Sequence, residues 1–187
     1  MRKLIYSVNL SIDGCFDLSI GPPPPAEDLG NFFINLLRNA GMLVYGRTTY
    51  EIMVPYWPNI ARNPAGETKE DVEFAEAFNA VEKVVFSKSL EKAESENTRI
   101  VRTNVEDEIR KLKLEEGKNM YVGGVTLASY LIELGLIDEY IFTIFPIIAG
   151  NGKRLMESIN MQEKLGLKLV NTKIFNSGCV MLHYVKQ

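Results

Sequence analysis

The sequence holds very little of the chemistry that metal sites and nucleophilic enzymes use. It has one histidine, His183, and two cysteines, Cys15 and Cys179, which are far apart in the chain. Neither cysteine belongs to a Cys-x-x-Cys pair, which argues against a zinc site; we expect no metal. The pattern also indicates no disulfide framework and favours a reducing compartment. A Ser-His-Asp or Cys-His site would have to use His183, which is better explained as a residue on a strand face.

Long apolar runs and a strong net charge are missing as well. No apolar run approaches the roughly 18 residues of a membrane-spanning helix, and the N-terminus lacks a signal-peptide pattern, so we expect a cytoplasmic protein. The net charge is −3, from 21 basic and 24 acidic residues. This balance gives no general attraction to nucleic acid or to membranes, so an anionic ligand would need local basic residues.

Two common nucleotide motifs are absent. The chain has no G-x-G-x-x-G, the usual dinucleotide fingerprint, and no G-x-x-x-x-G-K-[ST], the phosphate loop of many nucleotide hydrolases. A nucleotide ligand would therefore have to be held in another way.

The length and the periodicity predict one α/β domain over residues 1–187. Strands and helices alternate through residue 145, which is typical of a three-layer sandwich with a mostly parallel sheet. The last two strands, Leu167–Phe175 and Cys179–Lys186, flank Asn176-Ser177-Gly178 and predict an antiparallel hairpin. Three prolines in residues 54–68 favour a surface loop there. The other strands are expected at 2–10, 42–45, 83–87, 100–101, 119–122 and 137–148, and the helices at 26–39, from 47, and at 69–79, 104–115 and 125–134.

The most informative segment is the junction at Gly123-Gly124. An apolar run from Asn119 to Val122 ends at these glycines, and a helical pattern begins at once with Val125 and Thr126. Glycine lets the backbone approach a ligand closely, and a helix N-terminus offers free N–H groups to a phosphate. Strand-to-helix turns also use glycine for geometry alone, so this pair needs support from other motifs.

That support comes from two more motifs at predicted strand ends. They are Gly46-Arg47-Thr48-Thr49, which opens a helix, and Ser87-Lys88. In a parallel sheet the carboxyl ends of the strands meet at one edge, where ligands bind. Backbone donors, two hydroxyls and two cations at that edge suit a ligand with several phosphates. The alternative is that Thr48 or Thr49 only caps a helix and Lys88 is a solvated turn residue.

Together these pieces resemble the dihydrofolate reductase superfamily, and most of all the branch of the C-terminal reductase domain of the bifunctional riboflavin-biosynthesis deaminase/reductase. The matching segments keep their order and spacing over nearly the whole chain. They are Val8-Asn9-Leu10-Ser11-Ile12-Asp13-Gly14, Gly46-Arg47-Thr48-Thr49-Tyr50-Glu51, Val84-Val85-Phe86-Ser87-Lys88, Tyr121-Val122-Gly123-Gly124, Leu136-Ile137-Asp138-Glu139-Tyr140 and Pro146-Ile147-Ile148-Ala149-Gly150-Asn151-Gly152.

The resemblance implies NADPH-dependent reduction of a pyrimidine- or pterin-like heterocycle. It assigns Arg47 and Ser87-Lys88 to the adenosine 2′-phosphate, and places the pyrophosphate between Thr48-Thr49 and Gly123-Gly124-Val125-Thr126. It also implies a cis peptide between the two glycines and a lid over the nicotinamide at residues 13–25. The reaction named first is reduction of 5-amino-6-(5-phosphoribosylamino)uracil. Dihydrofolate-type reduction, or an NADP-binding module without turnover, is the alternative.

Five residues are candidates for the substrate side. Asp28-Leu29-x-x-Phe32 resembles the segment that supplies the carboxylate of dihydrofolate reductases, so Asp28 is the candidate catalytic acid and Phe32 a ring contact. Asp28 could instead be a first-turn acid that complements the helix dipole. Trp57 could stack on the substrate or pin its own segment to the core. By the same resemblance Asn9 and Asp13 would touch polar groups of the substrate.

Two further expectations concern a phosphate on the substrate and the oligomeric state. A phosphorylated substrate needs a second basic site near the lid, to which Lys153 or Arg154 could contribute; no second basic cluster stands out in the sequence. The apolar C-terminal hairpin should be covered, and the resemblance favours a homodimer; burial within the monomer is the alternative.

Overall fold

The structure is a computed structural model, and it describes residues 1–16, 21, 24–95, 97–157, 159–161 and 163–187. The predicted lid at 13–25 therefore lies partly outside the described residues. In the described part, no helix is both long and apolar enough to cross a membrane. The elements follow one another as β1 (Leu4–Ser11), α1 (Glu27–Asn39), β2 (Met42–Gly46), α2 (Arg47–Arg62), α3 (Lys69–Ala80), β3 (Glu82–Phe86), β4 (Thr98–Val101), α4 (Val105–Leu114), β5 (Met120–Gly123), α5 (Val125–Glu133), β6 (Glu139–Phe145), β7 (Leu167–Ile174) and β8 (Val180–Lys186).

One eight-stranded sheet, in the order β4-β3-β2-β5-β1-β6-β8-β7, organises the domain. The first six strands in this order are parallel, and β8 and β7 add an antiparallel hairpin at one side. The predicted α/β fold, with its mostly parallel sheet and C-terminal hairpin, is confirmed.

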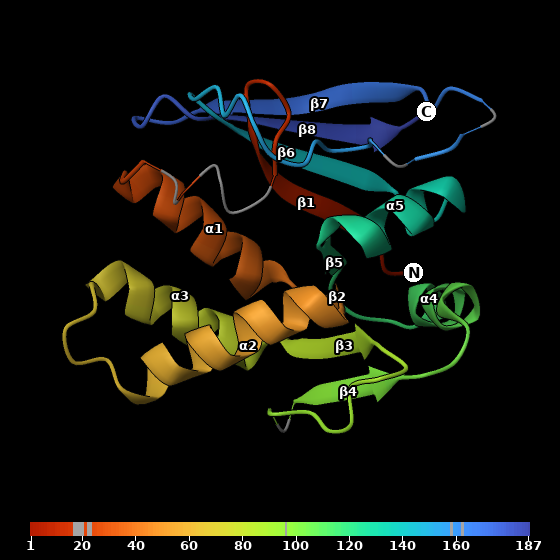
Figure 1. The fold of residues 1–187 in the computed structure, drawn as a ribbon, viewed down its shortest axis with the longest axis horizontal. Helices are drawn as coiled ribbons and strands as arrows, with labels where there is room; N and C mark the ends of the chain where they lie inside the picture. The colour runs from red at the N-terminus through yellow and green to blue at the C-terminus, as the bar shows by residue number, and fades with distance from the viewer. Residues whose placement is uncertain (17–20, 22–23, 96, 158, 162) are drawn as a thin grey trace.

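Helices cover both faces of the sheet, with α1, α2 and α3 on one side and α4 and α5 on the other (Figure 1). The alternation of side chains along each strand decides which core each residue enters. On β1, Tyr6 joins the core under α4 and α5, whereas Ile5 joins the core under α1. Because both faces are covered, an inner strand can be apolar on both faces, as on β2, where Met42 to Tyr45 are all buried.

Helix α2 corrects one prediction from the sequence. Residues 54–68 were expected to be a loop, but the helix continues through Pro55 and Pro58 to Arg62. Proline removes one backbone hydrogen bond and disfavours a helix interior. Packing outweighs that penalty here: Val54 and Ile60 are buried, and the ring of Trp57 lies 4.3 Å from that of Phe74 on α3. Trp57 therefore lies on a helix rather than on a loop.

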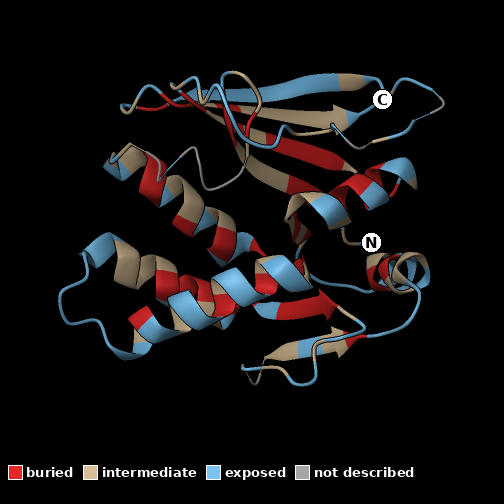
Figure 2. Cartoon of the chain, in the orientation of Figure 1, coloured by how far each residue is buried: buried red, intermediate tan, exposed pale blue. Residues whose placement is uncertain are grey.

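The hairpin leaves one strand uncovered. Strand β7 pairs only with β8, and nearly all of its residues are exposed (Figure 2). A bulge at Val170 shifts the register between Leu169 and Asn171. The apolar side chains of Leu169 and Ile174 are 46% and 76% exposed, so this end of the sheet offers apolar surface to solvent.

A fully buried lysine closes the end of α3. Lys83 donates from Nζ to the carbonyls of Phe78 (2.8 Å) and Val81 (2.7 Å), and its ammonium lies 4.5 Å from the centre of the Phe78 ring. These carbonyls lie at the C-terminal end of the helix, where a cation is favoured. Burial nevertheless lowers the pKa of Lys83 to about 8.

Replacing this lysine should change how stability depends on pH. The folded pKa lies below the ordinary value of 10.5, so the unfavourable contribution is complete below pH 8 and disappears as the pH rises towards 10.5. Relative to Lys83→Met, the natural protein should gain about 2 kcal/mol in unfolding free energy between about pH 7 and pH 9.5. Urea denaturation at several pH values measures it. The control is Lys164→Met, which removes an exposed lysine: relative to this variant the natural protein should show no such gain. Equal gains relative to the two variants would refute the burial argument.

Candidate functional site

The carboxyl ends of β3, β2 and β5 lie next to one another. Gly46 at the end of β2 is in register with Phe86 of β3, and Tyr45 is in register with Gly123 of β5. The three predicted motifs follow these residues directly. The structure therefore brings Gly46-Arg47-Thr48-Thr49, Ser87-Lys88 and Gly123-Gly124 to one edge of the sheet.

The glycine junction packs tightly against the start of α2. A Cβ on Gly124 would collide with the hydroxyl of Thr49, and a Cβ on Gly123 would meet the ring of Tyr45 at 2.6 Å. Gly124 also has a φ of +84°, which L residues rarely adopt. Both glycines are thus required sterically.

The prediction of a cis peptide between Gly123 and Gly124 is wrong, because this bond is trans. The positive φ of Gly124 turns the chain from β5 into α5 without a cis bond, which would be costly outside proline.

The two helices that begin at this edge have free N-termini. Gly46 and Gly124 are their N-cap residues, and neither helix has a capping hydrogen bond from a side chain. Helices α3 and α4, which begin elsewhere, are capped by Thr68 and Asn104. The alternative in which Thr48 or Thr49 caps α2 is therefore not what the structure adopts. Unpaired N–H groups and the positive end of each helix dipole remain available to an anion.

Basic side chains surround these helix starts. Arg47 is exposed and donates to the hydroxyl of Ser89 (3.2 Å), and Lys88 is exposed on the same turn. Ser87 shapes that turn by accepting a hydrogen bond from the N–H of Leu90 at 2.9 Å. A third cation, Arg102, lies beside this turn and donates to the backbone carbonyls of Lys88, Leu90 and Glu91. The sequence analysis missed Arg102 because it lies after β4, beside a motif that is distant in sequence.

A hollow lies between α1 and the sheet, on the same face as Gly123. It has a volume of about 220 Å³ and is lined by Phe32, Asn35, Leu36, Asn39, Tyr121 and Ile141. Tyr121 precedes Gly123 by two residues on β5, so about 7 Å of strand separates this hollow from the glycine turn. Of the predicted substrate residues, Phe32 is thus placed in a cavity.

Asn9 and Thr143 form a polar pair on the face that carries the hollow. They are in register on β1 and β6, and the side chains of in-register residues lie on the same face. The hydroxyl of Thr143 is buried without a hydrogen-bond partner among the described residues. A buried polar atom without a partner is unusual and needs an explanation. Thr143 gave no signal in the sequence, because a threonine within an apolar strand is ordinary.

Asp28 ties α1 to the hairpin. Its Oδ2 accepts a hydrogen bond from the N–H of Asn176 (3.0 Å) in the β7–β8 turn, and its Oδ1 is buried and has no partner in the described part of the chain. One oxygen thus has a structural role, while the other is left for a ligand or water. The catalytic role of Asp28 stays a prediction.

The carboxylate of Asp13 is already fully engaged by the protein. It accepts hydrogen bonds from the hydroxyl of Ser11 (2.7 Å) and from the N–H groups of Ala149 (2.9 Å) and Gly150 (3.0 Å), and it pairs with Arg154 at 3.3 Å. The Ser11 hydroxyl and these N–H groups hold the pKa of the Asp13 carboxyl well below its ordinary range. Asp13 thus fastens the end of β1 to the segment after β6. Its predicted contact with substrate stays untested.

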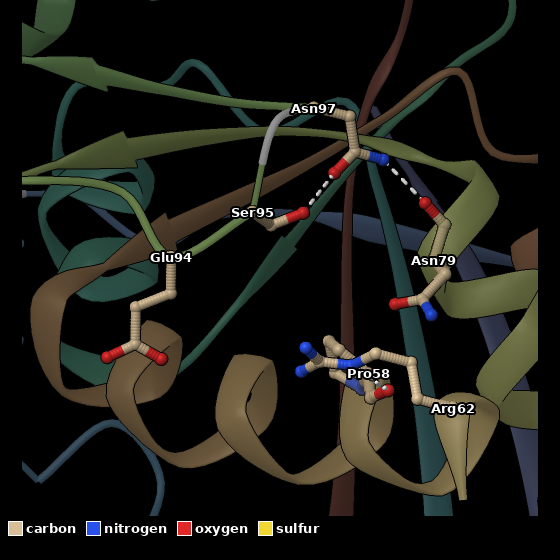
Figure 3. A pocket seen from close by; sticks show the side chains of 6 residues that line it. All are labelled: Pro58, Arg62, Asn79, Glu94, Ser95 and Asn97. Atoms are coloured by element: carbon tan, nitrogen blue, oxygen red, sulfur yellow. Dashed lines mark hydrogen bonds between the residues drawn. The ribbon is translucent and has the colours of Figure 1, made fainter.

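Another hollow, of about 360 Å³, lies beside the residues that precede β3 and β4, at the amino ends of these strands (Figure 3). Pro58, Arg62, Asn79, Glu94, Ser95 and Asn97 line it, and none of them belongs to the predicted site. Asn97 donates to the carbonyls of Asn79 and Val81 and accepts from Ser95, so it joins α3 to the segment before β4. These bonds indicate a structural junction.

The remaining titratable cluster is also structural. Glu139 is buried and accepts from Lys3 and from His183, whose Nε2 lies 2.8 Å away. Burial raises the pKa of Glu139, but the hydrogen bonds from Lys3 and His183 outweigh it, so the pKa lies below the ordinary value. His183 is thus a strand-face residue with an acidic partner. In the part of the chain that the structure describes, no group of three or more His, Cys, Asp or Glu could hold a metal ion.

The fold and this edge define a dihydrofolate reductase-like α/β domain, and comparisons with known proteins give the family. Residues 2–182 match the model of the RibD C-terminal domain, so the chain belongs to that family and, through it, to the oxidoreductases. Two relatives from Bacillus subtilis (strain 168) are the uncharacterized proteins YyaP, with 29% identity over 98% of this chain and 94% of the relative, and YwjB, with 26% identity over 99% and 98%.

Solved structures share the fold. A putative riboflavin biosynthesis protein from Shewanella sp. PV-4 matches with a TM-score of 0.74 and 16% identity, over 100% of this chain and 99% of that one. RibD from Acinetobacter baumannii gives a TM-score of 0.65 and 15% identity, and this chain covers 58% of its length. A dihydrofolate reductase from Enterococcus faecalis, complexed with NADP(H) and RAB-propyl, gives a TM-score of 0.63 and 15% identity, over 99% of this chain and 96% of that one.

The tight glycine turn leads to a stability prediction. Gly124→Ala should destabilise the protein by about 2 kcal/mol or more, because alanine at positive φ is strained and its Cβ collides with Thr49. Adding Thr49→Ala to this variant should recover the part of the stability loss that the collision causes, and the part that the positive φ causes should remain. Urea denaturation gives both values.

The matched control is Gly46→Ala. Gly46 has a φ of −82°, and a Cβ there would meet only the Cβ of Leu127, at 3.8 Å. This variant should be nearly as stable as the natural protein. Equal losses for Gly46→Ala and Gly124→Ala would contradict the steric explanation.

Proposed function

We propose that this protein is an NADPH-dependent reductase of a pyrimidine- or pterin-like heterocycle. The observation that carries the proposal is the meeting of two uncapped helix N-termini, a glycine cradle and three cations at one sheet edge. Membership of the RibD C-terminal domain family supports the same reading. By that resemblance the reaction type is reduction of 5-amino-6-(5-phosphoribosylamino)uracil, with dihydrofolate-type reduction as the second candidate.

The residues at the edge fit a doubly phosphorylated cofactor. In the proposed arrangement Arg47, with Ser87 and Lys88, holds the 2′-phosphate, for which the planar guanidinium is well suited. Thr48 and Thr49 at one helix start, and Gly124, Val125 and Thr126 at the other, hold the pyrophosphate. A Cβ at position 124 would collide with Thr49, so glycine is what lets the two helix starts approach each other.

NADPH supplies a hydride when it is bound. The chain's own contribution is to orient and to exclude water. The hollow under α1 takes the heterocycle beside the glycine turn, with Phe32 on one wall. The pair Asn9 and Thr143 offers an amide and an unpartnered hydroxyl to polar atoms of the ring. Asp28 is the candidate that holds a proton, through its free Oδ1.

Removing either cation should weaken the binding of NADPH but not that of NADH. Arg47→Ala and Lys88→Ala should each weaken NADPH binding roughly 10- to 100-fold, because each loses a charge-assisted contact to phosphate. NADH binding should change little, since it lacks the 2′-phosphate. Titration monitored by nucleotide fluorescence measures both constants.

The control is Arg62→Ala, the same change at the far end of the same helix. Arg62 lines the separate hollow of Figure 3 and should leave both constants unchanged. The proposal fails if the natural protein binds no NADPH, or if Arg62→Ala weakens binding as much as Arg47→Ala.

We also propose that the protein is a homodimer that packs through the hairpin. On one face of β7, Leu169, Thr172 and Ile174 lie opposite Tyr184, Leu182 and Val180 of β8, which forms a mostly apolar surface. The lysines of β7, Lys168 and Lys173, alternate onto the other face and discourage pairing edge to edge. A second copy placed by a two-fold axis would cover the apolar face with the same face of its own sheet.

Light scattering at micromolar concentration should therefore give twice the mass of 21.1 kDa. Ile174→Lys should shift the protein to monomer, because it places a charge within the apolar face. Ile52→Lys is the control, since Ile52 is 51% exposed on α2, away from the hairpin. A monomeric natural protein would overturn the dimer without affecting the cofactor site.

A further inference from the structure

The hollow under α1 is lined only by uncharged side chains. Asn35 and Asn39 bring amides, Tyr121 brings a hydroxyl, and Phe32, Leu36 and Ile141 bring apolar surface. A molecule bound in this hollow could be held by hydrogen bonds and packing, but no cation among the lining residues could neutralise a phosphate.

The strands and the helix around the hollow also contain few basic residues. Between Lys3 and Arg38 the sequence contains no lysine or arginine, and this stretch includes β1, the lid segment and most of α1. It does contain four acids, namely Asp13, Asp17, Glu27 and Asp28. Strand β6, on the other side, also has no basic residue. Among the described residues, β1 and β6 and the part of α1 that lines the hollow therefore bring no cation to it.

The nearby cations are already engaged. Lys3 and His183 bind Glu139, and Arg38 lies 3.3 Å from Glu73. Lys118 donates to the carbonyl of Arg38 (2.9 Å) at the end of α1. Arg154, which could reach a phosphate from the lid side, donates to the backbone and to the carboxylate of Asp13. Its neighbour Lys153 also has an interaction of its own.

The dipole of α1 acts in the same direction. The helix begins at Glu27 and ends at Asn39, and Asn35 and Asn39, which line the hollow, lie in its last two turns. The C-terminal end of a helix carries partial negative charge, which disfavours an anion. The cofactor edge has the opposite character, with two helix N-termini beside Arg47, Lys88 and Arg102.

We infer that the heterocycle reduced by this protein carries no phosphate, and that its distal end is an uncharged or cationic group held by Asn35, Asn39 and Tyr121. This inference rests on the proposed function and narrows its substrate class. The ring chemistry stays that of an aminouracil or a pterin. What changes is the group attached to the ring, which is a hydroxyl-bearing or amine-bearing substituent in place of a phosphorylated one.

The test compares 5-amino-6-(5-phosphoribosylamino)uracil with the same compound lacking the phosphate, using NADPH oxidation as the readout. The kcat/KM of the dephosphorylated compound should be at least about 10-fold higher than that of the phosphorylated compound, because no lining cation compensates the charge of the phosphate. Preference for the phosphorylated compound would overturn the inference, and so would a selective loss of its turnover in Lys153→Ala.

A charge placed in the hollow should remove the preference. Asn39→Arg should raise kcat/KM for the phosphorylated compound about 10-fold and leave the other compound nearly unchanged. Asn63→Arg adds the same charge at the end of α2, outside the hollow, and should change neither. If Asn39→Arg and Asn63→Arg behave alike, the distal group does not lie in this hollow, and the inference is wrong.

Calorimetry keeps the inference separate from the proposed function. Both compounds are titrated into protein saturated with NADP⁺ and, separately, into protein without nucleotide. Tighter binding of the dephosphorylated compound without any turnover supports the inference while the reductase proposal fails. Tighter binding of the phosphorylated compound, or no binding of either, overturns the inference even if NADPH itself binds well.

Discussion

The parallel register of β3, β2 and β5 is the constraint on which the candidate site depends. Because Gly46 pairs in register with Phe86, and Tyr45 with Gly123, three turns that are distant in sequence must leave the sheet side by side. The contact between Gly124 and Thr49 then fixes how closely the two helix starts approach each other. A side chain in that contact would separate them, so a backbone constraint decides whether two sets of N–H groups act as one anion site.

The same sheet separates two electrostatic environments within a short distance. At the strand ends, helix N-termini and arginines create positive potential without any excess of positive charge in the whole chain, which has a net charge of −3. About 7 Å down β5, at Tyr121, the hollow is lined by uncharged side chains. Burial raises the pKa of the Tyr121 hydroxyl, and nearby Glu139 raises it further, so this group stays a neutral hydrogen-bond donor. A ligand that spans both regions must be charged at one end only.

The sequence predicted the fold and the meeting of the three motifs at one sheet edge, because both follow from local patterns combined with one topological rule. A strand followed by glycine and then by a helix can be recognised from the order of the residue types, and parallel strands bring their carboxyl ends to one edge of the sheet. Helix α2 was predicted too short, because Pro55 is a strong local signal and the packing of Trp57 on Phe74 is not local. Arg102 and Thr143 were missed for the same reason: each acquires its meaning only from a neighbouring strand or turn.

Asp28 and Asp13 show that resemblance to a motif does not by itself assign a chemical role to a residue. Both are acids near the expected substrate, yet their surroundings separate them. All the hydrogen bonds to Asp13 come from its own protein, and they hold its carboxylate ionised and in place between β1 and the segment after β6. Asp28 gives one oxygen to the hairpin and keeps the other buried and unpaired. An unpaired buried oxygen is unfavourable unless a ligand or water completes it, and of these two acids Asp28 is the one with such an oxygen among the described residues.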